Sequence, residues 1–340
     1  MLPNPEIFQL AIRVGSYKLL RVLDALGVHL KELPSQLFEL YHLRYLALMG
    51  SFTIPSAVSN LVNLQTLIIH LASGRLREKR DGGVRHSLPL EIWMLPQLRH
   101  LFCHSPHMLP HPLQGLNLPL ENLQTLLLVS DLVLDEKILQ LIPNVKRLGL
   151  TYITPQSQSF ELHLQDLHQL EKLEVIGYGG SLWRSKSPSF PCTLKKLTLV
   201  GVGFTWKDMA IVGLLPNLEI LKLLNYACYG LTWETNDDHF PQLKYLLIDG
   251  SYLEQWITES NPFPTLKCLV LHSCRSLREI PEGIGEIPTL ELIEVEYCTA
   301  SLVESAKKIK EDQESYGNDV LQVVCASHEV FGGLKCVRFA

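Results

Sequence analysis

The sequence lacks the features that carry a protein into or across a membrane. Its 340 residues contain no uninterrupted run of 18 or more apolar residues. The first residues, MLPNPEIFQLAIRVG, lack the charged segment and long apolar run of a secretory signal. The eight cysteines are scattered, with no terminal pair of the kind that staples secreted repeat domains. These absences predict a reduced protein of the cytoplasm and argue against a receptor ectodomain.

The sequence also lacks a large excess of charge and the short motifs of nucleotide-binding or hydrolytic enzymes. A net charge of −5 and a pI near 6.2 give no reason to expect nucleic acid or an anionic membrane as a partner. There is no G-x-x-x-x-G-K-[ST] loop, no G-x-G-x-x-G after a strand and no G-x-S-x-G elbow. We therefore expect no catalysis and no cofactor.

Histidines are concentrated in one stretch, HLFCHSPHMLPH, which spans residues 100–111. His100 and His104 are four residues apart on a predicted strand, which separates their Cα atoms by roughly 13 Å. Two histidines that far apart cannot share an ion, although His104 with His107 or His111 remains an alternative. We expect no metal site.

What the sequence does contain is a repeated phrase, L-x-x-L-x-L. Its first positions are Leu20, Leu43, Leu64, Leu98, Leu123, Val145, Leu170, Leu194, Leu218, Leu243, Leu266 and Leu290. They follow one another at intervals of 21 to 25 residues, except for one interval of 34 residues. Leucine-rich repeats have a period of roughly 20–29 residues, with one short strand in each repeat.

The phrase predicts the fold. Alternate residues of a strand face opposite ways, so the second and third leucines, such as Leu46 and Leu48, point inward together. One repeat cannot bury its leucines alone, so neighbouring repeats stack. We predict an α/β leucine-rich repeat solenoid, or horseshoe, with a concave parallel β-sheet, about 12–13 irregular repeats and a helical C-terminal cap.

The rhythm of the phrase also predicts the domain organisation. Residues 1–19 are expected to form an N-terminal cap or an incomplete first repeat, and residues 20–299 the repeats. Residues 300–340 are expected to form a C-terminal cap, a helix plus a strand, and a tail. Opposite charges four residues apart, Glu304 with Lys308 and Lys307 with Glu311, are typical of an exposed helix.

The residues between the inward leucines should form the concave face. Its first third is aromatic and nearly uncharged, its middle is basic, and its end, with Asp249, Glu294 and Glu296, is acidic and expected to be open to solvent. Such a surface resembles a protein-binding surface in composition, although variable positions of a solenoid can also simply drift. The predicted protein-binding residues are Tyr45, Met49, Ile68, His70, His100, Phe102, His104, Arg147, Lys172, Lys196, Lys222 and Tyr245. In the phrase that begins at Leu123, the pattern also places Val129 on this face.

The interval of 34 residues contains a charged insertion, GRLREKRDGGVRH. Flanking glycines predict a loop, which is either solvated or a basic contact for an acidic partner surface. Its basic residues are Arg75, Arg77, Lys79, Arg80 and Arg85.

The phrases resemble those of one protein family. LKELPSQLFELYHLRYLAL, LREIPEGIGEIPTLELIEVEYC and the tail ESAKKIKEDQESYGND are similar to the leucine-rich repeat region of plant intracellular immune receptors. These are the coiled-coil, nucleotide-binding, leucine-rich repeat disease resistance proteins, and the tail resembles their late blight resistance group. The resemblance runs from about Leu19 to about Val324.

The resemblance implies a function in plant innate immunity. In the family, the repeats sense a pathogen effector or a guarded host protein and restrain a nucleotide-binding switch, whose domain the loop from Arg75 to Arg85 would contact. The switch motifs are absent from this sequence, so nucleotide binding is not carried over, and we expect a receptor fragment or a truncated gene product. The alternative is a standalone intracellular leucine-rich repeat scaffold or adaptor. A ubiquitin-ligase substrate arm is disfavoured because no F-box-like helical segment precedes the repeats.

Overall fold

The computed structural model of the chain describes residues 17–71, 87–112, 119–153, 164–178, 188–258, 263–317 and 319–326. The chain divides into two compact units, the first ending at Leu194 and the second beginning at Lys195. Most of the predicted N-terminal cap, the basic loop and the end of the C-terminal tail lie outside the described residues. Among the described residues, no helical segment has the length and apolar character that a membrane-spanning helix needs.

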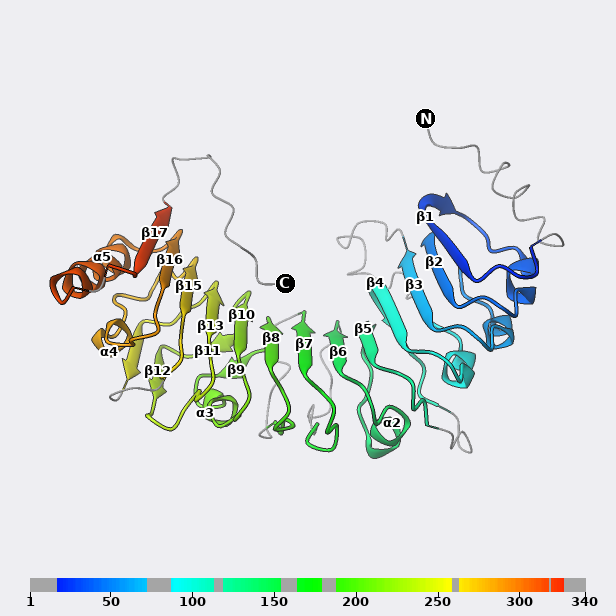
Figure 1. The fold of residues 1–340 in the computed structure, drawn as a ribbon, viewed down its shortest axis with the longest axis horizontal. Coiled ribbons are helices and arrows are strands. Elements are labelled where there is room, and N and C mark those ends of the chain that lie inside the picture. The colour runs from blue at the N-terminus through cyan, green and yellow to red at the C-terminus, as the bar shows by residue number, and fades with distance from the viewer. Residues whose placement is uncertain are drawn as a thin grey trace. The chain divides into compact units, whose positions relative to one another are not determined.

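The first unit is a ladder of parallel strands that lie side by side in chain order (Figure 1). Its strands are β1 (Val22–Leu30), β2 (Tyr45–Gly50), β3 (Thr66–Leu71), β4 (His100–Met108), β5 (Thr125–Ser130), β6 (Arg147–Tyr152) and β7 (Lys172–Gly177). Each of them pairs with the next in parallel.

Short helical turns connect these strands and pack their apolar residues against the ladder. They are the 3₁₀ helices η2 (Ser35–Glu39), η3 (Ser56–Asn60) and η5 (Leu90–Met94), and the α-helix α2 (Glu136–Leu141). Pro34, Pro55 and Pro89 precede the three 3₁₀ helices, where a residue without an N–H loses no hydrogen bond. Asp135 caps α2, since its side chain accepts a hydrogen bond from the backbone N–H of Ile138 at 2.9 Å.

The second unit repeats this plan with extra short strands behind the ladder (Figure 1). Its ladder contains β8 (Lys196–Val200), β10 (Ile220–Leu224), β13 (Tyr245–Asp249), β15 (Cys268–His272), β16 (Leu292–Glu296) and β17 (Gln322–Ala326). Two small parallel sheets pair β9 (Phe204–Thr205) with β11 (Cys228–Tyr229) and β12 (Thr232–Thr235) with β14 (Gln255–Thr258). The helices are α3 (Met209–Gly213), α4 (Glu282–Gly285) and α5 (Ala300–Ser315).

The leucines of the phrase are stacked as the pattern predicts. In the first unit, Leu46, Leu67 and Leu101 are in register and at most 1% exposed. In the second unit, Leu221 and Leu246 are in register and fully buried. Burying one leucine side chain contributes about 1.5–3 kcal/mol, so the stacked leucines are the main stabilising feature of each ladder. The predicted leucine-rich repeat solenoid is confirmed.

A second repeated contact joins successive repeats through the residue that precedes the first leucine of the phrase. The side-chain amide of Asn63 donates to the carbonyl of Tyr41 at 2.6 Å, 22 residues earlier. Asn122 and Asn144 do the same to Pro96 and Glu121, at 3.0 and 2.9 Å. In later repeats threonine hydroxyls take over this contact, from Thr193 to Leu170, from Thr265 to Leu243 and from Thr289 to Leu266. We call this series the polar stitch.

Strand β5 departs from the predicted alternation. In β5, Leu128 adopts a left-handed backbone conformation with φ of 58°, and the pairing with β6 shifts between Leu126 and Val129. The shift turns Val129 into the core, fully buried, and leaves Leu128 half-buried. The prediction that Val129 lies on the concave face was therefore wrong, because a β-bulge reverses the alternation beyond it.

Helix α5 and strand β17 end the described part of the second unit and lie beside each other (Figure 1). Thr299 caps the start of the helix, since its hydroxyl accepts a hydrogen bond from the backbone N–H of Leu302 at 3.3 Å. The expected charge pairs four residues apart are replaced by others. Lys308 contacts Glu282 of α4 at 3.1 Å, and Lys307 contacts Glu304 at 2.9 Å, because the apolar side of α5 packs towards α4.

Behind the ladder of the second unit, three tryptophans form a column. The ring of Trp233 stacks between Trp206 and Trp256, with centroids 4.9 Å away on each side. Phe240 and Phe263 pack edge-on against Trp233, each at 6.1 Å. Trp233 is 1% exposed, so the column is a core in its own right.

Candidate functional site

The twelve predicted protein-binding residues all lie on ladder strands, and none of them is buried. They fall into two groups, one in each unit. The first unit holds Tyr45, Met49, Ile68, His70, His100, Phe102, His104, Arg147 and Lys172, and the second holds Lys196, Lys222 and Tyr245. Their role in binding stays a prediction. The basic loop from Arg75 to Arg85 lies outside the described residues.

In the first unit, the register brings the aromatic and histidine residues together on β2, β3 and β4. Tyr45 and His100 flank Thr66 in one row, and Ile68 lies beside Phe102 in the next. The rings of His100 and Phe102 are stacked at 6.0 Å, and those of His70 and His104 lie 5.0 Å apart. We call these residues, with Met49, the aromatic patch. Aromatic side chains that are partly open to solvent on a rigid backbone are typical of protein-binding surfaces.

The aromatic patch is bordered by positive charge. Burial lowers the pKa of His100, and the nearby guanidinium groups of Arg99 and Arg147 lower it further, so this imidazole stays neutral near pH 7. Its Nδ1 lies 3.1 Å from the hydroxyl of Thr125. Arg147 is in register with Lys172 on the next strand, which places two cations side by side. This surface therefore suits a partner that combines apolar side chains with carboxylates.

In the second unit, the basic residues are less concentrated. Lys196 is in register with Ile220, and Lys222 with Thr198, so the two lysines lie in different rows. The ammonium group of Lys222 lies 5.5 Å from the centre of the Tyr245 ring. A cation above an aromatic face is held electrostatically, which fixes this lysine over the tyrosine.

The histidine-rich stretch supplies an ion pair in the described residues. His111 Nε2 lies 2.8 Å from Asp135 Oδ2, and both side chains are about half exposed. Burial alone would raise the pKa of Asp135, yet the hydrogen bonds from Ile138 and His111 lower it. His111 thus supports the cap of α2.

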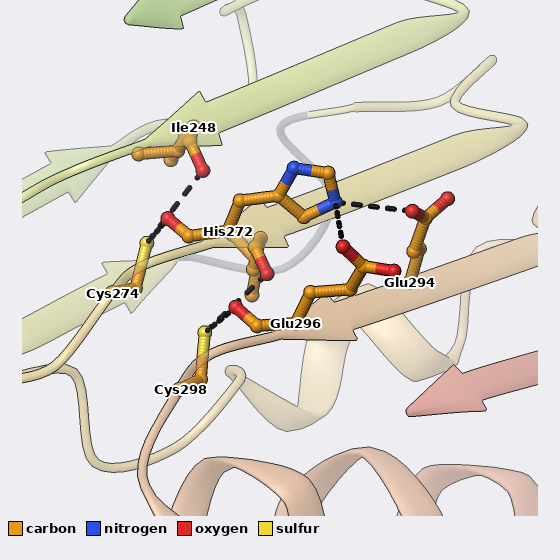
Figure 2. A network of polar contacts seen from close by, with 7 residues as sticks. Ile248, His272, Cys274, Glu294, Glu296 and Cys298 are labelled. Atoms are coloured by element: carbon orange, nitrogen blue, oxygen red, sulfur yellow. Dashed lines mark hydrogen bonds and ion pairs between the residues drawn. The ribbon is translucent and has the colours of Figure 1, made fainter. Parts of the chain in front are cut away.

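Sequence reasoning missed a convergence of polar side chains at β15 and β16 (Figure 2). His272 Nε2 lies 3.0 Å from Glu294 Oε1 and 3.7 Å from Glu296 Oε2. Glu294 was expected in an open acidic patch, but it is only 7% exposed because neighbouring strands pack against it. The signal was present in the sequence, since His272 and Glu296 occupy the same position of successive phrases, 24 residues apart.

Two thiols lie just beyond this cluster, a buried one at Cys274 and a half-buried one at Cys298 (Figure 2). Cys274 contacts the carbonyl oxygens of His272 and Ile248 at 3.4 and 3.7 Å, and Cys298 contacts those of Glu296 and Leu271 at 3.2 and 3.3 Å. A hydrogen bond between the two thiols, together with burial, raises the pKa of Cys274, and the same bond lowers the pKa of Cys298. Both residues are thiols, with no disulfide between them.

The placement of the aromatic patch makes a testable prediction. Replacing Tyr45, His100 and Phe102 by Ala together should keep the circular dichroism spectrum and cooperative unfolding, because the backbone ladder does not depend on these half-buried rings. The free energy of unfolding should fall by no more than about 1 kcal/mol per residue. Partner recovery in a pull-down should fall.

The matched control removes three aromatic rings that lie off the strand faces, at Tyr41, Tyr178 and Tyr316, which are 54%, 46% and 84% exposed. This control should keep both fold and partner recovery. Unfolding of the Tyr45/His100/Phe102 variant, or equal loss of partner from the control, would show that the aromatic patch is not the binding surface.

Parallel strands in chain order, which from β1 to β16 of the ladder carry the repeated leucine phrase, define this chain as a leucine-rich repeat protein. No protein-family model matches it. Its sequence is similar to two putative late blight resistance protein homologs of Solanum demissum, with 34% and 33% identity over 93% and 91% of this chain. Late blight resistance protein R1-A of the same species is 32% identical over 93% of this chain. The chain is therefore homologous to a region of the late blight resistance proteins, as its phrases predicted.

The match covers only part of those relatives. The chain spans 24% of the length of each of the three. Among solved structures, one titled "Crystal structure of PEPR1-AtPEP1" aligns with 90% of this chain and 45% of its own, at 16% identity and a TM-score of 0.40. A plant ice-binding protein aligns with 91% of this chain and 83% of its own, at a TM-score of 0.32. Neither likeness bears on the function of this chain.

Proposed function

We propose that this chain is the recognition module of a plant immune receptor. It binds a pathogen effector or a guarded host protein on its strand faces, and it restrains the nucleotide-binding domain of the same receptor or of a partner receptor. The observation that carries the proposal is the homology to late blight resistance proteins over 93% of the chain. The module supplies recognition and contributes no catalytic step or cofactor.

The surface chemistry supports two contacts of different kinds. The aromatic patch offers apolar rings bordered by Arg147 and Lys172, which suits a partner with apolar and acidic side chains. The loop from Arg75 to Arg85 carries five basic residues and only two acidic residues, Glu78 and Asp81. We assign this loop to the contact with the nucleotide-binding domain, where its charge would steer and orient docking.

A chimeric receptor tests the proposal. The chain replaces the homologous quarter of a late blight resistance relative, and the chimera is expressed in leaf tissue. If the chain restrains the receptor, the leaf should stay healthy without an effector, whereas the same receptor without the repeats should trigger cell death. Replacing Arg75, Lys79 and Arg80 by Glu should release the restraint, because like charges would then face the acidic partner surface.

The control replaces Glu78 and Asp81 of the same loop by Lys, which leaves the basic residues in place and should preserve restraint. Cell death from the unmodified chimera, or full restraint by the charge-reversed loop, would contradict the proposal. An immunoblot of source tissue addresses the scaffold alternative: a band near 38.5 kDa indicates repeats that act alone. A band about four times larger indicates a receptor of the relatives' length, of which the chain would be 24%.

A further inference from the structure

We propose that His272, Glu294 and Glu296 form a binding site for a divalent transition-metal ion, with Zn²⁺ as the best match. The sequence pointed away from metal because it directed attention to the histidines of residues 100–111. The cluster at β15 and β16 lies outside that stretch. Within the described residues, its three side chains form the group whose ligand atoms lie close enough together to hold a metal ion. The inference does not rest on the proposed immune function.

The backbone ladder fixes the three side chains relative to one another. His272 on β15 is in direct register with Glu296 on β16, and Glu294 lies two residues earlier on the same face of β16. One ligand atom from each of the three residues lies within 4.8 Å of the other two. Figure 2 shows both carboxylates turned towards the same imidazole nitrogen, Nε2 of His272.

The distances suit a small ion. Zn²⁺ binds histidine nitrogen at about 2.0–2.1 Å and carboxylate oxygen at about 2.0–2.2 Å, so a tetrahedral ion holds its ligand atoms roughly 3.3 Å apart. The observed separations, 3.0 Å from His272 to Glu294 and 3.7 Å from His272 to Glu296, bracket that value. An imidazole ligand favours zinc, copper, nickel or iron over magnesium and calcium, which prefer oxygen ligands alone.

The charges of the cluster also call for a cation. Among the residues that the structure describes, Glu294 is the one buried carboxylate, with its side chain only 10% exposed. Burying a carboxylate is costly unless it is paired or binds a metal. Asp249 on β13 is in register with His272 and adds negative charge, while Val324 and Ala326 of β17, in register with Glu294 and Glu296, are uncharged. A divalent ion would offset two of these negative charges.

The site would hold its ion with three protein ligands, as zinc sites with an open position do. A water molecule, or a nitrogen, oxygen or sulfur atom of a bound partner, would complete the coordination. The ion would therefore act both as a clamp between β15 and β16 and as an anchor for the partner.

Titration of the purified chain with Zn²⁺ alone, by isothermal calorimetry, tests the proposal. Co²⁺ alone serves as a second probe because its visible absorption reports coordination by nitrogen and oxygen. We expect the chain to have one site that binds the ion more tightly than any other site. His272→Asn, Glu294→Gln or Glu296→Gln should each lower the affinity of that site about tenfold or more. Glu296→Gln guards against a folding defect, since this side chain is 30% exposed.

Two matched controls separate the site from adventitious binding. Glu291→Gln removes the same charge three residues from Glu294, at an exposed carboxylate that pairs with Lys267 at 2.7 Å. His111→Asn removes the histidine of the exposed pair with Asp135. Both controls should bind Zn²⁺ and Co²⁺ like the unmodified chain. Absence of binding, unchanged affinity in the folded site variants, or an equal loss in the controls would overturn the proposal and leave the cluster as an ion pair.

Discussion

Replacing Leu126 by Asp is expected to unfold the first unit. Leu126 is fully buried in β5 and in register with Leu101 and Leu148, so the carboxylate would enter the stacked leucines with no partner. A charge buried in this way, together with the lost apolar contacts, costs about 4–5 kcal/mol or more. Urea unfolding followed by circular dichroism should show the loss of the first unit's transition, or a chain that is already unfolded in buffer.

The control is the same substitution one residue further along. Leu127 faces the other side of β5 and is half-buried, so Leu127→Asp should leave a cooperative transition with a smaller loss of stability. If the two variants unfold alike, the inward and outward faces of β5 are not as described, and the concave placement of Phe102, which is in register with Leu127, is lost as well.

The second large effect is expected at the tryptophan column. Replacing Trp233 by Ala removes a ring that is 1% exposed, stacked on both faces and flanked by Phe240 and Phe263. The neighbouring rings are themselves packed and cannot close the gap, so the cost should reach about 3–5 kcal/mol. The Nε1 of Trp256 lies buried without a hydrogen-bond partner. This ring is therefore held by packing and not by a hydrogen bond, so it loses most of its support when the Trp233 ring is removed.

Denaturant unfolding at 25 °C measures this loss, with Tyr226→Ala as the control. Tyr226 stacks on Tyr252 at 4.5 Å but is 47% exposed, so its removal should cost only about 1 kcal/mol. A Trp233 variant as stable as the Tyr226 variant would mean that the small sheets behind the ladder contribute nothing to the stability of the second unit.

The leucine phrase was enough to predict the ladder. When every repeat carries leucine at the same alternate positions, stacking the repeats side by side is the arrangement that buries those leucines. It was not enough to predict β5, where Leu123, Leu126 and Leu128 match the phrase but Leu128 turns outward. A bulge depends on how the connecting segment leaves the strand, and this is not encoded in the spacing of leucines.

Two other features escaped the pattern for different reasons. Trp206, Trp233 and Trp256 lie 27 and 23 residues apart, close to one repeat, so comparison of equivalent positions in successive repeats could have revealed the column. The same comparison pairs His272 with Glu296. The burial of Glu294 could not be foreseen, because it depends on how closely the flanking strands pack around a position that alternation assigns to the surface.

The polar stitch has a consequence for how such a chain can change over generations. Each stitch joins a repeat only to the one before it, from Asn63 to Tyr41 and again from Thr289 to Leu266. A gain or loss of one whole repeat of about 24 residues would therefore recreate the same contact at the new junction, as expected of repeats that touch only their neighbours. Unequal recombination could lengthen or shorten the recognition surface while every retained row of side chains keeps its spacing, so new binding specificities can arise without a new fold.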